Sequence, residues 1–79
     1  MYAIITKVSD VSTGGQYETE FTIYGDNGEQ WQETTSFNQT EYSKTADVQT
    51  YIKKRMAFYQ QSVSVVADLK KLIGVEIKP

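Results

Sequence analysis

The sequence predicts an α+β domain in which a three-stranded antiparallel β-meander packs against one long C-terminal α-helix, in the order βββα. Two glycine-containing turns divide residues 1–37 into three stretches of alternating apolar and polar residues, which is the period of a β-strand. Residues 46–73 instead repeat apolar residues every three or four positions, which is the period of a helix face. With 79 residues, we expect a single domain with a linker at 38–45 and a tail at 74–79.

The expected strands cover about residues 2–11, 16–24 and 29–37, with turns at residues 12–15 and 26–28. The length of the second turn decides which side chains share a face. A two-residue turn would pair Tyr24 with Trp31 and split the apolar residues between both faces. A three-residue turn with Gly28 in the left-handed conformation pairs Ile23 with Trp31 and keeps one apolar face. We therefore expect the three-residue turn.

For the first strand, we expect Ile4 to pair with Ile23, Val8 with Thr19 and Lys7 with Glu20. The resulting core face, directed at the helix, comprises Ile4, Val8, Tyr17, Phe21, Ile23, Trp31 and Phe37. Three apolar residues remain on the outer face as a candidate contact patch, namely Ala3, Ile5 and Tyr24. Glu33 falls opposite Phe21 on the core side, so its carboxylate needs a charged partner or a place at the sheet margin.

The helical stretch carries two neighbouring apolar stripes. The first, expected to pack on the sheet, comprises Val48, Ile52, Met56, Tyr59, Val63, Val66 and Ile73. The second has apolar residues seven positions apart at Tyr51, Phe58, Val65 and Leu72. Together the stripes span about 200°, whereas a surface helix usually buries little more than about 100°. Thr45 is the expected N-cap and Gly74 the expected C′ residue.

The second stripe is the strongest functional indication. These four apolar residues fit the d positions of a heptad, with Val48, Arg55, Ser62 and Leu69 at the a positions. The expected interaction surface is therefore Tyr51, Arg55, Phe58, Val65, Leu69 and Leu72. Because Arg55 and Ser62 suit a strong two-stranded coil poorly, a short helix dimer or docking onto another protein fits better. Alternatively, the tail or the linker covers this stripe within one chain.

Charge is divided unevenly along the chain. Residues 1–42 contain one lysine and seven acidic residues, a net charge of −6, whereas residues 43–79 contain seven basic and three acidic residues, a net charge of +4. Either the two halves complement each other within the chain, or this polarity orients self-assembly or a charged partner. Lys53, Lys54 and Arg55 are candidate phosphate contacts and support the alternative of a nucleic-acid-binding βββα module. An acidic inhibitor that imitates the charge of DNA is a third hypothesis.

The residue types exclude several kinds of chemistry. The chain has no histidine and no cysteine, so Ser-His-Asp and Cys-His catalysis and thiolate or imidazole metal sites are impossible. Glu18 and Glu20 share a strand face, but their polar surroundings lack the burial that acid catalysis requires. We therefore expect no enzyme, no catalytic residue, no cofactor and no bound metal.

No stretch approaches the roughly 20 apolar residues of a membrane span, and no charged-then-apolar segment opens the chain. We expect a soluble protein, cytoplasmic or virion-associated, without a membrane partner. The leading hypothesis is a non-enzymatic interaction or assembly module that binds itself or another protein. A phage or mobile-element protein, either a virion component or a modulator of a host protein, would fit this hypothesis. Nucleic acid is not the expected main partner.

Overall fold

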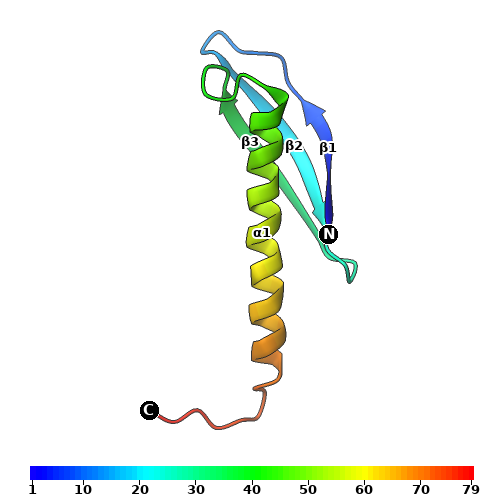
Figure 1. The fold of residues 1–79 in the computed structure, drawn as a ribbon, viewed down its shortest axis with the longest axis vertical. Coiled ribbons are helices and arrows are strands. Elements are labelled where there is room, and N and C mark those ends of the chain that lie inside the picture. Colours follow the sequence, from blue (N-terminus) through cyan, green and yellow to red (C-terminus); the bar gives the residue numbers. More distant parts are fainter.

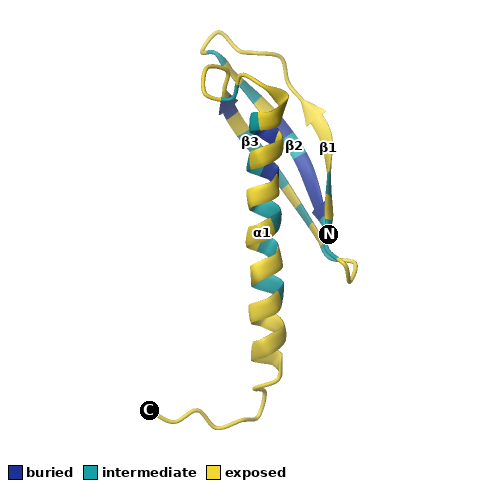
Figure 2. Cartoon of the chain, in the orientation of Figure 1, coloured by how far each residue is buried: buried dark blue, intermediate teal, exposed yellow.

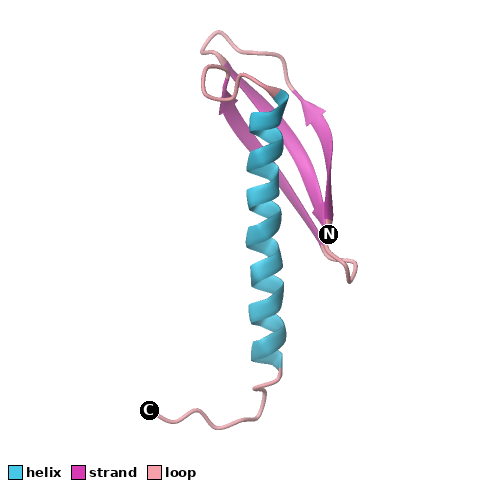
Figure 3. Cartoon of the chain, in the orientation of Figure 1, coloured by secondary structure: helices cyan, strands magenta, loops and turns pink.

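The computed structural model describes residues 1–79 and has the βββα arrangement (Figure 1). Strands β1 (Tyr2–Val8), β2 (Gln16–Tyr24) and β3 (Gln30–Asn38) form one antiparallel sheet in the order β1-β2-β3. Helix α1 (Thr45–Lys70) lies against one face of this sheet, and the tail after it has no regular structure (Figure 3). The predicted fold class is confirmed.

The hairpin formed by β2 and β3 has the predicted register. Ile23 pairs with Trp31, and Phe21 pairs with Glu33. Gly28 adopts φ of +86°, the left-handed conformation that the three-residue turn requires. Because side chains alternate along a strand, this register puts the aromatic residues of β2 and β3 on the face that α1 covers.

Strand β1 departs from the predicted register at one residue. Val8 pairs with Thr19 and Lys7 with Glu20 as expected, but a bulge at Thr6 shifts the residues before it. Ala3, not Ile4, therefore pairs with Ile23, and Ile5 pairs with Phe21. An extra residue in one strand turns the preceding side chains to the opposite face. The predicted place of Ile4 on the core face is therefore wrong.

The core lies where α1 crosses β2 and β3. Its five buried apolar residues are Phe21, Ile23, Phe37, Val48 and Ile52. Tyr42, from the loop before α1, packs on Phe37 with ring centroids 4.6 Å apart, and its carbonyl accepts a 2.7 Å hydrogen bond from the Tyr17 hydroxyl. The small core is thus closed at one end by the linker.

The ends of α1 lie close to the predicted positions. Lys44, not Thr45, occupies the N-cap position, because the Asp47 carboxylate accepts a 3.1 Å hydrogen bond from the Lys44 backbone amide. At the other end, a turn follows Lys70 and reaches Gly74, which has φ of +82° as expected for a residue that ends a helix.

Helix α1 is longer than the sheet it packs on. Its 26 residues span about 39 Å, whereas a nine-residue strand spans about 30 Å. All residues from Ser64 to Ile73 are exposed, and we call them the protruding segment (Figure 2). The first stripe was predicted to pack on the sheet as far as Ile73, but it is at least partly covered only as far as Val63.

The protruding segment makes the molecule elongated. The radius of gyration is 17.0 Å, compared with about 12 Å for a compact domain of this length. The principal extents are 56 × 29 × 18 Å. The fold is therefore unusual because the sheet covers α1 only up to Val63 and leaves the rest of the helix exposed.

Candidate interaction surface

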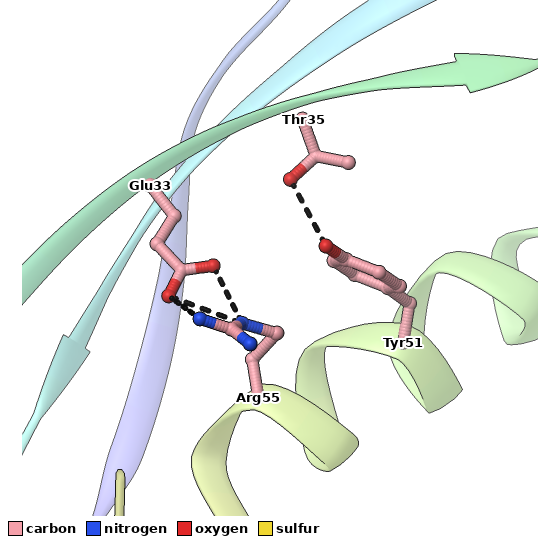
Figure 4. A network of polar contacts seen from close by, with 4 residues as sticks. All are labelled: Glu33, Thr35, Tyr51 and Arg55. Atoms are coloured by element: carbon pink, nitrogen blue, oxygen red, sulfur yellow. Dashed lines mark hydrogen bonds and ion pairs between the residues drawn. The ribbon is translucent and has the colours of Figure 1, made fainter. Parts of the chain in front are cut away.

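Tyr51 is partly buried and packs against the core, so it lies apart from the exposed surface to which the sequence assigned it. Its ring packs edge-on against Phe37 at 5.1 Å and against Tyr42 at 6.3 Å between centroids. The Thr35 hydroxyl lies 3.4 Å from the Tyr51 hydroxyl, to which it donates a hydrogen bond (Figure 4). Tyr42 of the linker thus covers Tyr51, the first residue of the second stripe. At this end of the stripe, the structure agrees with the alternative that the linker covers it within one chain.

Arg55 is also engaged within the chain. Its Nε donates a 2.8 Å hydrogen bond to Oε1 of Glu33, and its Nη2 donates a 2.9 Å bond to Oε2, so the ion pair is bidentate (Figure 4). This pair supplies the partner that the Glu33 carboxylate needed. The hydrogen bonds from Arg55 hold the pKa of Glu33 below its ordinary value, against the opposing effect of burial. The same contact raises the pKa of Arg55.

Two aromatic contacts mark where the packed part of α1 ends. Trp31 stacks on Tyr59 with centroids 4.6 Å apart, and the Arg55 guanidinium lies 4.6 Å from the centroid of Phe58. Hydrogen bonding to Glu33 and burial raise the pKa of Tyr59. Phe58 therefore rests with one side against Arg55 and Tyr59, while the rest of its ring faces solvent.

Four of the six residues predicted for the interaction surface are free. Phe58, Val65, Leu69 and Leu72 are 51%, 50%, 57% and 44% exposed, and we call this set the free stripe. Val66 and Ile73, assigned to the sheet-facing stripe, are 48% and 80% exposed and extend the apolar surface around the helix. The expected helix is longer than the expected strands, so the sequence could have predicted that Val66 and Ile73 lie beyond the end of the sheet.

A groove joins the free stripe to the sheet. It lies between α1 and the β2–β3 turn and has a volume of about 490 Å³. Trp31 and Glu29 line the sheet side, while Val63, Val66 and Lys70 line the helix side. A second hollow beside Phe58 and Val65 shares Ser62 and Val66 with this groove. The apolar surface is therefore continuous from Phe58 to the protruding segment.

The candidate phosphate contacts are reduced to two free cations. Lys53 and Lys54 are exposed, but Arg55 is held by Glu33. Two neighbouring lysines supply little of the basic surface that a nucleic-acid interface requires.

The predicted patch of Ala3, Ile5 and Tyr24 does not form on one face. The bulge at Thr6 places Ala3 and Ile5 on the side of the sheet that α1 occupies, whereas Tyr24 lies on the opposite side. There Tyr24 stacks on Tyr2 with centroids 4.9 Å apart, and Ile4 follows on the same face. The outer face thus carries a different exposed cluster from the one predicted.

The exposed area of the whole chain is large for its size. A folded monomer of 9.0 kDa exposes about 4,900 Å², whereas this chain exposes 6118 Å². The excess of about 1,200 Å² is larger than the roughly 800 Å² that each partner buries in a standard protein interface. The protruding segment and the tail contribute to this surplus, because every residue from Ser64 to Pro79 is exposed.

Comparisons with protein-family models, curated proteins and solved structures find no match for this chain. No part of α1 combines the length and apolar character of a bilayer-spanning helix. No three acidic side chains are grouped so that they could hold a metal ion.

Proposed function

We propose that this protein is a non-enzymatic interaction module that associates with copies of itself through the free stripe of α1. The observation that carries the proposal is the protruding segment, where a continuous apolar surface has no cover within the chain. Leu69 and Leu72 would each stabilise an interface by about 0.7–1.7 kcal/mol if their exposed halves became buried. A contiguous exposed apolar surface on a soluble domain commonly marks an interaction site.

The biological setting is part of this proposal. A small domain that assembles without a cofactor suits a virion component or a modulator of a host protein in a phage or mobile element. The cytoplasm or the virion is the corresponding location. Nucleic-acid binding has less support than self-association, because Arg55 is paired with Glu33 and only Lys53 and Lys54 remain as candidate phosphate contacts.

The test is the molar mass in solution, measured by light scattering after size exclusion over a wide range of concentrations. We expect a dimer or a larger species that dissociates on dilution. Leu69→Glu places a charge on the free stripe and should yield a folded monomer, because Leu69 has no partner in the core. Gln60→Glu adds the same charge on the opposite, polar side of α1 and should leave the mass unchanged.

Circular dichroism should show the same helix content for both variants when they are compared at equal protein concentration. A wild-type chain that remains a monomer at every concentration would contradict the proposal. Equal dissociation by Leu69→Glu and Gln60→Glu would contradict the assignment of the surface.

A further inference from the structure

We infer that the occupant of the free stripe is a second copy of this chain whose α1 runs antiparallel, so that Phe58 of each copy lies against Leu72 of the other. This inference rests on the proposed function and adds the direction of the partner. It follows from the spacing of the stripe, from the division of charge between sheet and helix, and from the polarity of the helix.

The spacing of the stripe determines how two antiparallel copies overlap. Phe58 and Val65 lie seven residues apart on α1, and Leu72 follows seven residues later in the turn after Lys70, so the stripe is about 21 Å long with Val65 near its middle. Two antiparallel stripes cover each other completely when Val65 faces Val65. The dimer then has a twofold axis at this residue, and both copies use the same surface, which closes the assembly at two chains.

The room around α1 permits this overlap. The sheet covers the side of the helix that carries Val48, Ile52 and Tyr59, whereas the free stripe points about 90° away from that side. A second helix can therefore pass along Phe58 without meeting β2 or β3. Ser62, between Phe58 and Val65, has a small side chain that leaves a gap in the stripe and does not obstruct a second helix.

Charge selects the antiparallel direction. The sheet half, residues 1–42, has a net charge of −6, and residues 43–79 have a net charge of +4. A parallel dimer would place the two acidic sheets at the same end, where they repel each other. An antiparallel dimer places them at opposite ends, and each sheet then lies on the same side of the twofold axis as Lys70 and Lys71 of the partner.

The helix dipoles favour the same direction. Each helix carries a partial negative charge at its C-terminal end. In a parallel dimer the two negative ends lie side by side, whereas in the antiparallel dimer they lie at opposite ends of the pair.

Cysteine cross-linking tests the direction, because the natural chain has no cysteine that could interfere. Phe58→Cys and Leu72→Cys are prepared separately, mixed, and oxidised under mild conditions. We expect a disulfide between position 58 of one copy and position 72 of the other, identified by mass spectrometry, and few homotypic links. Gln60→Cys, on the polar side of the same helix, measures the background of random collisions.

Each outcome leads to a separate conclusion. Homotypic 58–58 and 72–72 links would show a parallel pair and overturn the inference. Cross-linking at the Gln60→Cys background in a chain that is dimeric by light scattering would also overturn it, while the proposed function would survive. A chain that is monomeric throughout would overturn both.

A second measurement does not alter the stripe at all. A spin label at Lys53→Cys, on the polar side of α1, reports the distance between the two copies. In the antiparallel dimer, the labelled positions are separated by about 36 Å along the helix axis. In a parallel dimer, they lie at the same height, separated mainly by the interaxial distance of about 10 Å and the length of the labels. The short distance would contradict the antiparallel arrangement.

Discussion

The N-terminal and C-terminal parts of α1 share one helix and one pattern of apolar residues but differ in what covers them. In the first part, Val48 and Ile52 are buried against the sheet, and Tyr51 and Arg55 have specific partners. In the second part, Val65, Val66 and Leu69 have equally apolar side chains and remain exposed. Helical periodicity therefore shows that a face avoids water, but not whether the same chain or another one covers it.

The largest expected difference is between a strand ring that the N-terminal part of α1 covers and a ring on the free stripe. Phe21→Ala removes a fully buried ring and should lower the free energy of unfolding by about 3–5 kcal/mol. Phe58→Ala should lower it by less than about 1 kcal/mol in the dissociated chain, because half of that ring is already exposed. Urea unfolding at low protein concentration gives both values. Similar losses for the two variants would contradict the division of α1.

The ion pair at the boundary should have an intermediate effect. Arg55→Met leaves the Glu33 carboxylate largely buried without its partner, and should lower the free energy of unfolding by about 1–3 kcal/mol. Lys53→Met removes a cation from the exposed side of the same helix and should change it by no more than about 0.5 kcal/mol. If both variants behave alike in urea unfolding, Arg55 does not fasten α1 to the sheet.

The same pair predicts how stability depends on pH. Because Arg55 lowers the pKa of Glu33 in the folded state, the contribution of this pair is complete above the ordinary pKa of 4.5. This contribution is lost as the pH falls from 4.5 through the lowered pKa, because the Glu33 carboxylate of the folded chain then becomes protonated as well. Between neutral pH and acid, wild type should therefore lose more stability than Arg55→Met. Equal losses in urea unfolding at both pH values would contradict this linkage.

The smallest predicted effect strengthens the exposed part instead of weakening it. Ser62→Leu fills the polar gap between Phe58 and Val65 on the free stripe. If this stripe is an interface, the added apolar surface should tighten the dimer about tenfold or more, which corresponds to about 1.4 kcal/mol. Sedimentation equilibrium measures the change, and Ser64→Leu on the polar side is the control. An unchanged dissociation constant for Ser62→Leu would place the contact elsewhere.

Much of the sheet could be predicted from turn chemistry. The alternation along β2 and β3 left two registers open, and the requirement for one apolar face selected the turn with Gly28 in the left-handed conformation. Strand β1 offered no such constraint before Thr6, because Ile4 and Ile5 are equally apolar. A bulge between two registers of similar hydrophobicity leaves no mark in the sequence, so the outer patch was assigned to the wrong residues.

The interaction surface could be predicted only in part, because its N-terminal end depends on contacts far apart in the sequence. Tyr51 packs against Tyr42 and accepts a hydrogen bond from Thr35, and Arg55 forms an ion pair with Glu33. The helical pattern alone therefore could not show that Tyr51 and Arg55 have partners within the chain. The sequence indicated that Glu33 needs a charged partner. It did not indicate which helix residue lies opposite Glu33, because that depends on how α1 is placed along the sheet. The exposure of Ile73 follows from the different rise of helices and strands.

Hydrogen exchange at several protein concentrations tests the central claim most directly, because it follows both parts of α1 in one chain. Amides around Val48 and Ile52 should stay protected at every concentration, since the sheet covers them. Amides from Val65 to Leu72 should exchange quickly in dilute protein and become protected as the dimer forms, and Leu69→Glu should abolish that gain. Protection of the protruding segment that does not change with concentration in wild type would contradict the account.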